Sequence, residues 1–280
     1  MTREIKMIAL DLDGTLLDDQ KCLSRRNEAA LKACAERGIE IVPCTGRNWN
    51  GVPDCVRQLP GVHYAITANG AVVEDVRNHK VIAETKLSNA LACDILEMAK
   101  QFQTVMYDVY IDGQGYGQKN FLEQIETSGL PAFFQKMVLS NRRSVPDIIK
   151  ETRRQGIPCE KVNYMFCDPE ARLCARDALL LRGDVEVSSS YDFNLEINAA
   201  GATKGDAIVQ LAGYLGIPKE QTMGFGDGEN DRTMMKMAGI GVCMANGAET
   251  VRQMADYITA TNNEDGVAQA IEKLIFDRRR

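Results

Sequence analysis

A short apolar run near the start of the chain, followed directly by two carboxylates, constrains the fold most strongly. The residues from Met7 to Leu10 carry no polar side chain, which is typical of a strand buried in the middle of a parallel sheet. Asp11 and Asp13 follow, and continued extended backbone would place both on one side. Gly14 then permits a sharp turn. Because ligands of open α/β sheets bind beyond the carboxyl ends of the strands, we expect a polar site here.

The chemistry of two neighbouring carboxylates limits which ligands and reactions such a site can serve. Two carboxylates this close repel each other, and burial raises the cost unless a cation lies beside them. Hard oxygen ligands of this kind suit Mg²⁺. An ionised aspartate can also act as a nucleophile while a neighbouring acid moves protons. A strand that ends in an ordinary Asp-Gly turn with solvated charges gives the same pattern, so this stretch alone leaves both interpretations open.

The composition argues against several classes of protein. The 280 residues are 45% hydrophobic and 26% charged, and the formal net charge of −6 argues against a dedicated nucleic-acid binder. Nine scattered cysteines without a C-x-x-C pair indicate reduced thiols rather than disulfides or a zinc site. No signal-like N-terminus and no apolar run of membrane-spanning length is found. We expect a cytoplasmic protein without nucleic-acid or membrane partners, either a monomer or a weak homodimer.

A βαβ unit follows the first motif. Residues 24–37 read as a helix that begins at a serine cap, and residues 39–44 read as the next strand. This strand ends at Thr45, Gly46 and Arg47, which parallel pairing brings to the same sheet edge as the two aspartates. A hydroxyl followed by a glycine amide suits a phosphate oxygen, although an ordinary strand-to-helix turn explains the same residues.

The pattern changes in the middle of the chain. A third strand at 64–68 ends at Asn69 and Gly70, and a hairpin over residues 72–82 follows it. Residues 86–190 then mix helical and strand patterns, with the glycine-rich stretch 112–117 read as a hairpin. After this segment, residues 194–197 are predicted as a strand of the returning core, and Lys204 opens an amphipathic helix to about residue 216. A further strand at 221–225 ends in an acidic loop, residues 226–231.

Four segments in order resemble the motifs of the haloacid dehalogenase (HAD) superfamily of phosphotransferases. They are Asp11-x-Asp13-Gly-Thr, Thr45-Gly-Arg, Lys204-Gly and Gly226-Asp-Gly-Glu-Asn-Asp231. The residues around these motifs resemble those of the Cof-type phosphatases with a C2 (C2B-like) cap. The resemblance implies an α/β fold with a Rossmann-like parallel-sheet catalytic core over residues 1–85 and 191–280. Residues 86–190 would form an inserted α+β cap that selects the substrate.

The resemblance also implies a role for each motif. Asp11 would attack phosphorus and form an aspartyl-phosphate, and Asp13 would act as the acid and base. The phosphate-binding residues would be Leu12, Thr45, Gly46, Lys204 and Asn230. A Mg²⁺ ion would be held by Asp11, Asp13 and Asp227, with Asp231 either binding it through water or supporting Lys204. For Arg47, Asn69 and Gly70, contact with substrate and anchoring at the cap junction both stay open.

The expected activity is Mg²⁺-dependent hydrolysis of a small phosphorylated metabolite, either a sugar phosphate or a phosphorylated cofactor. A phosphomutase of the same superfamily is an alternative, because the motifs that we identify do not separate transfer to water from transfer to another hydroxyl. A non-catalytic regulatory protein on this scaffold is a second alternative. Asp11, Asp13, Lys204 and Asp227 are all present, which argues against a degenerate copy.

Overall fold

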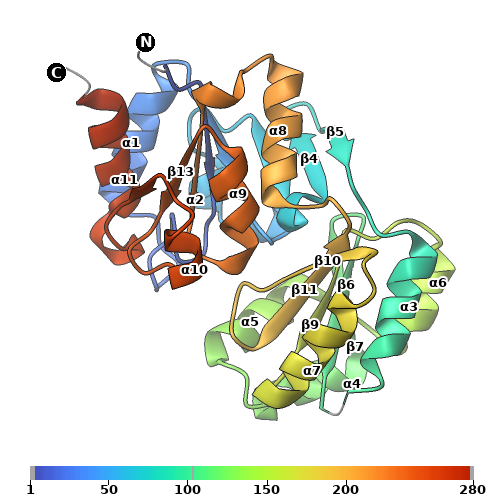
Figure 1. Cartoon of the computed structure of the whole chain (residues 1–280). Helices are drawn as coiled ribbons and strands as arrows, with labels where there is room; N and C mark the ends of the chain where they lie inside the picture. Colours follow the sequence, from blue (N-terminus) through green and yellow to red (C-terminus); the bar gives the residue numbers. More distant parts are fainter. Residues whose placement is uncertain (1–3, 103, 278–280) are drawn as a thin grey trace. The chain divides into compact units, whose positions relative to one another are not determined.

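The chain folds into two compact units (Figure 1). The computed structural model describes residues 4–102 and 104–277. Unit 1 contains residues 52–84 together with the described residues up to 46 and from 203 onward, and unit 2 contains residues 47–51 and 85–202. Over these described ranges, no helix combines the length and apolar character needed to cross a membrane.

Unit 1 is built on a parallel five-stranded sheet. Its strands, in spatial order, are β14 (Tyr257–Ile258), β13 (Ile240–Cys243), β12 (Thr222–Gly226), β1 (Met7–Leu10) and β2 (Glu40–Pro43). A smaller antiparallel sheet holds β3 (Tyr64–Thr67), β4 (Val72–Asp75) and β5 (Lys80–Glu84), and Ile66 of β3 forms a parallel bridge with Cys44. The apolar run therefore forms a central, fully buried strand, as predicted.

Helices cover both faces of this sheet. They are α1 (Arg25–Ala35), α2 (Asp54–Arg57), α8 (Lys204–Leu215), α9 (Arg232–Met237), α10 (Glu249–Arg252) and α11 (Gly266–Ile271). Side chains of α8 and α9, including Met234 and Met235, pack with Met7 and Ala9 of β1. Figure 1 shows α1 and α11 on the other side of the sheet, where the Asn27 side-chain oxygen accepts from the Ala268 backbone N–H at 2.9 Å.

Unit 2 contains a six-stranded mixed sheet. In spatial order its strands are β10 (Val185–Ser188), β11 (Asn194–Ala199), β9 (Lys161–Met165), β6 (Met106–Ile111), β7 (Gln114–Gln118) and β8 (Arg142–Val145). Its helices are α3 (Asn89–Ala99), α4 (Lys119–Gln124), α5 (Ala132–Asn141), α6 (Ile148–Gln155) and α7 (Pro169–Leu180). The glycine-rich stretch forms the β6–β7 hairpin, as predicted. The sequence patterns did not predict helices α4 and α5.

One predicted strand lies in a different unit from the one expected. Residues 194–197 were assigned to the returning core, but β11 pairs antiparallel with β9 and β10 inside unit 2. The chain enters unit 1 again only at Thr203. The alternation of Leu195 and Ile197 with polar residues fits any half-covered strand, so periodicity could not tell which sheet it joins.

The first prediction concerns the packing of α8 against α9. A Cβ atom on Gly205 would lie 2.6 Å from the Thr233 carbonyl oxygen, whereas a Cβ on Gly213 of the same helix would meet open space. Gly205→Ala should therefore destabilise the protein by about 1–3 kcal/mol through overpacking. Gly213→Ala should stabilise it by about 0.5–1 kcal/mol through helix propensity. Urea denaturation of both variants checks this, and equal effects from the two would contradict the packing account.

Candidate active site

The parallel sheet of unit 1 brings three predicted motifs to one edge. Leu10 pairs with Phe225, so Asp11 and the loop that contains Asp227 leave adjacent strands at the same end. The Asp11 backbone N–H continues this pairing and donates to the Phe225 carbonyl at 2.9 Å. Helix α8 begins at this edge with Lys204 as its first residue. Asp11 and Lys204, which lie far apart in the sequence, therefore meet where the sheet topology predicts a ligand site.

Lys204 is the centre of the cluster. Its side chain is 0% exposed, and its Nζ lies 2.5 Å from Asp11 Oδ1 and 2.6 Å from Asp231 Oδ1. Burial by itself would lower the pKa of Lys204, but the two carboxylates outweigh burial and raise it above its ordinary value. Lys204 is therefore a permanent positive charge beside the proposed nucleophile.

Asp231 has both of its carboxylate oxygens occupied by protein groups. Oδ1 accepts from Lys204, and Oδ2 accepts from the backbone N–H groups of Asp227 and Gly228, each at 2.9 Å. These bonds fix the acidic loop and the lysine together. Of the two roles left open for Asp231, this geometry favours support of Lys204 over direct binding of a metal.

Asp227 is held by the turn that follows the first motif. Its Oδ1 accepts from the Thr15 hydroxyl at 2.7 Å, and a Cβ on Gly14 would lie 2.5 Å from its Oδ2. Gly14 also has a φ of +82°, which other residues rarely adopt. Gly14 therefore meets two demands at once, the turn itself and the close approach of Asp227.

The cluster fits a divalent cation. Asp11, Asp227 and Asp231 offer carboxylate oxygens that all lie within 4.8 Å of one another. Three carboxylates and one ammonium carry a formal charge of −2, which a divalent cation would balance. Burial, and then the charge of Asp231, raises the pKa of Asp227 to about 7, and burial raises the pKa of Asp11 against the pull of Lys204. The hard oxygen donors suit Mg²⁺.

Two residues of this set are suited to direct metal binding. Asp11 and Asp227 each have one oxygen engaged, by Lys204 and by Thr15 respectively. Their second oxygens are without a hydrogen-bond partner among the residues that the structure describes. These two oxygens are therefore the ones that can face a cation.

Asp13 lies outside the carboxylate cluster. The regular strand ends at Leu10, so the alternation expected to place Asp11 and Asp13 together does not continue. The Asp13 carboxylate instead forms an ion pair with Lys21 at 2.9 Å, and its side chain is 18% exposed. A partly exposed carboxylate beside the cluster can exchange protons with water, as an acid and base must.

The remaining phosphate-binding candidates frame the same edge. Leu12 is buried, and its carbonyl accepts from the Leu17 N–H at 2.9 Å. Thr45 is buried at the end of β2, and Gly46 follows it. The Asn230 side-chain amide donates to Asn69 Oδ1 at 3.1 Å, so Asn69 positions Asn230.

Arg47 and Gly70, the other two residues with open roles, have local structural explanations. Arg47 belongs to unit 2, where its Nη1 donates to the Gly51 carbonyl at 2.8 Å. A Cβ on Gly70 would lie 2.3 Å from the Thr203 carbonyl oxygen, so the residue permits a close approach to the start of α8. Packing therefore accounts for Gly70 without a substrate contact.

Sequence reasoning did not assign a site role to three nearby residues. Thr15 holds Asp227, Lys21 pairs with Asp13, and Cys44 is a buried thiol next to Thr45. Burial raises the pKa of Cys44 well above its ordinary value, so it is a neutral thiol. The threonine of the first motif was a usable signal for Thr15, whereas Lys21 lies in a loop without a pattern.

The second prediction tests whether Asp231 supports the cluster. Asp231→Ala leaves Lys204 with one carboxylate and leaves two backbone N–H groups without their acceptor. We expect a loss of about 3–5 kcal/mol in the free energy of unfolding. Asp256→Ala is the matched control, because that exposed carboxylate accepts a backbone N–H from Gly241 at 2.8 Å. Equal losses in urea denaturation would contradict a special role for Asp231.

The chain is similar to known proteins over nearly its whole length. Residues 8–271 match the model of the haloacid dehalogenase-like hydrolase family. A relative from Bacillus subtilis, the 5-amino-6-(5-phospho-D-ribitylamino)uracil phosphatase YcsE, is 31% identical, covering 98% of this chain and 97% of its own. The phosphatase YwpJ of the same organism is 29% identical, with coverage of 97% and 100%.

Solved structures give the same result. The structure of a haloacid dehalogenase-like hydrolase from B. subtilis superimposes with a TM-score of 0.83 at 28% identity, covering 96% of this chain and 99% of the other. The predicted fold class, a parallel-sheet core with an additional α+β unit, is confirmed. The chain therefore belongs to the haloacid dehalogenase-like hydrolases and is a phosphatase of that family.

Proposed function

We propose that this protein is a Mg²⁺-dependent phosphatase that hydrolyses a small phosphorylated metabolite through an aspartyl-phosphate on Asp11. The observation that carries the proposal is the buried contact of Lys204 with Asp11 beside Asp227. A carboxylate nucleophile needs a neighbouring positive charge when a phosphate dianion approaches, because the two anions repel each other.

The first half of the reaction assigns distinct tasks to the two aspartates. Asp11 attacks phosphorus in line through its carboxylate, and the bond to the leaving oxygen breaks. Asp13 donates a proton to that oxygen, so an alcohol departs. Lys204, at the start of helix α8, and the residues Thr45 and Gly46 hold the phosphoryl oxygens. The charge that spreads over these oxygens is the main barrier that the site lowers.

In the second half, Asp13 accepts a proton from water as the water attacks phosphorus. The phosphorus–Asp11 bond then breaks, inorganic phosphate leaves, and both aspartates return to their starting states. Lys21 contacts Asp13 in its ionised form, which is the form that accepts this proton. This division of tasks explains why Asp11 is buried against the Lys204 ammonium while Asp13 is partly exposed.

The divalent cation would be held by Asp11, the backbone carbonyl of Asp13, and Asp227. When bound, it supplies positive charge that offsets the negative charge of the transferring phosphoryl group. Asp231 is assigned as a positioning residue, because both of its oxygens already accept from protein groups.

We further propose that unit 2 is the substrate-selecting cap. It has its own six-stranded sheet and its own hydrophobic core, so it can move as a body. The named substrate of the relative YcsE is a small phosphorylated metabolite, which supports a small phosphoester here. The phosphatase names of the relatives favour hydrolysis over a phosphomutase, and the complete charge cluster disfavours a regulatory protein.

The third prediction concerns the nucleophile. Asp11→Asn cannot attack phosphorus, so turnover of 4-nitrophenyl phosphate should fall by at least about three orders of magnitude. Binding of a phosphorylated ligand, measured by calorimetry, should persist. Asp54→Asn, an exposed aspartate of unit 1, should retain turnover. Phosphate release by Asp11→Asn at the wild-type rate would refute the assignment.

The fourth prediction concerns the metal. Chelation should abolish turnover and added Mg²⁺ should restore it, because the excess negative charge of the cluster repels a phosphate. Asp227→Ala should abolish Mg²⁺ binding in calorimetry, whereas Glu229→Gln, in the same loop but outside the carboxylate cluster, should retain it. Full activity in metal-free buffer would remove the cation from the mechanism.

A further inference from the structure

Helix α7 of unit 2 has apolar side chains on two opposite sides. On the inner side, Ala175 and Leu179 pack into the hydrophobic core of unit 2. On the outer side, Leu173 is 54% exposed and Leu180 is 53% exposed, and the adjoining Leu181 is 88% exposed. Residues seven positions apart lie two turns apart on the same side of a helix, so Leu173 and Leu180 belong to one strip. A gathered set of exposed leucines, unlike a single one, marks a candidate interaction surface.

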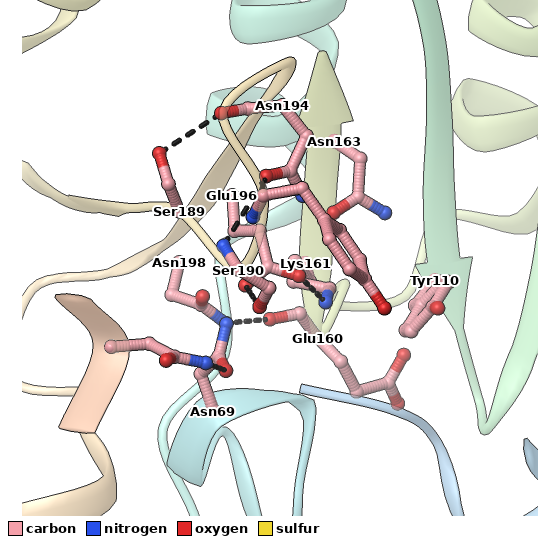
Figure 2. A network of polar contacts seen from close by, with 12 residues as sticks. Asn69, Tyr110, Glu160, Lys161, Asn163, Ser189, Ser190, Asn194, Glu196 and Asn198 are labelled. Carbon is pink, nitrogen blue, oxygen red and sulfur yellow. Dashed lines mark hydrogen bonds and ion pairs between the residues drawn. The ribbon is translucent and has the colours of Figure 1, made fainter. Parts of the chain in front are cut away.

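The inner side of α7 is fixed to the rest of unit 2 by hydrogen bonds. Arg172 Nε donates to the Asn194 carbonyl at 3.0 Å, and its Nη2 donates to the Ser189 hydroxyl at 2.6 Å. The loop that receives these bonds is itself held, because the Ser189 hydroxyl donates to the Asn194 carbonyl and the Ser190 hydroxyl donates to Glu196 at 2.7 Å (Figure 2). A partner would therefore meet a preformed surface on the outer side of α7, which lowers the entropy lost on binding.

The outer strip of α7 is complementary to itself. Arg176 and Asp177 lie between the two leucines, three and four positions from each, on the same side of the helix. When a second copy of the helix runs antiparallel, Leu173 faces Leu180 of that copy, and Arg176 faces its Asp177. Every contact then occurs twice, as a two-fold interface requires.

The charged residues at the centre of the strip can form these contacts. The Asp177 carboxylate is exposed and has no ion-pair partner among the described residues. The Arg176 guanidinium carries five N–H donors, so it can serve an acceptor in a second copy in addition to its contacts within the chain. Two crossed ion pairs at the centre would set the antiparallel direction, because parallel helices would place like charges together.

The sheet edge next to α7 is a poorer docking surface. The edge strand β10 has only four residues, and it exposes the charged side chain of Glu186. Short, charged edge strands disfavour pairing with a strand of another molecule. The helix strip, rather than the sheet edge, is therefore the surface that suits a second copy.

We propose that this protein forms a homodimer in which α7 packs antiparallel on α7 of a second copy, with the two-fold axis between Arg176 and Asp177. The inference does not depend on the proposed function, and it selects the weak homodimer from the two expected oligomeric states. Helix α7 has 12 residues and is therefore about 18 Å long. Two such helices bury less area than a standard interface, so the dimer should be weak, with a Kd of about 10–100 µM.

Sedimentation velocity of the full chain over about 1–300 µM tests the proposal, because a dimer of this strength forms within that range. Leu173→Asp should raise the Kd at least about tenfold, since it places a charge against an apolar partner. Leu139→Asp is the matched control, because Leu139 is a 45% exposed leucine on α5 of the same unit. Its Kd should stay within about twofold of wild type.

A charge exchange tests the antiparallel register. Asp177→Arg places two arginines against each other and should raise the Kd at least about fivefold. Adding Arg176→Asp to that variant restores opposite charges across the axis, and the Kd should return to within about threefold of wild type. Far-UV circular dichroism of each variant checks that the helix is retained.

Three results would overturn the proposal. A chain that stays monomeric over the whole concentration range would show that α7 does not bind a second copy. A dimer weakened equally by Leu173→Asp and Leu139→Asp would show that the interface is not the α7 strip. Equal Kd values for Asp177→Arg and for the double exchange would refute the antiparallel register.

Discussion

The contacts of one buried ammonium hold the proposed catalytic edge together. Lys204 is reached by carboxylates from two different strand ends, Asp11 after β1 and Asp231 after β12. Breaking either contact would leave a buried charge without its partner. The resulting loss of stability would be far larger than the stability that an exposed ion pair contributes. The close approach of α8 to α9 at Gly205 and the three bonds of Asp231 then keep this lysine in place. The positions of the turn, the loop and the helix start all depend on this arrangement.

The balance of buried charge distinguishes the two units. In unit 1 the carboxylates outnumber the ammonium by two, and burial together with the neighbouring charge of Asp231 raises the pKa of Asp227. In unit 2 the charges of Asp108, Arg142, Lys161 and Glu196 cancel. The first arrangement suits a divalent cation and a phosphate.

The sequence predicted the parts of the site that depend on short-range pattern. Met7–Leu10 formed a buried central strand, Lys204 opened a helix, and the acidic loop followed a strand, because each has a clear local signal. Parallel strand order then determined that Asp11 and Asp227 meet. The sequence could not predict that the strand ends at Leu10 or that the Asp13 carboxylate forms an ion pair with Lys21, since both depend on tertiary packing. Periodicity also could not tell which sheet Leu195 and Ile197 would join.

The central claim is that phosphate is transferred to Asp11, and chemical trapping tests it most directly. Sodium borohydride reduces an acyl phosphate, so protein quenched during turnover should carry homoserine in place of the phosphorylated aspartate. Peptide mass spectrometry should locate homoserine at position 11, in amounts that depend on substrate and Mg²⁺. Homoserine at position 13 or 227, or no homoserine in protein that is turning over substrate, would contradict the account.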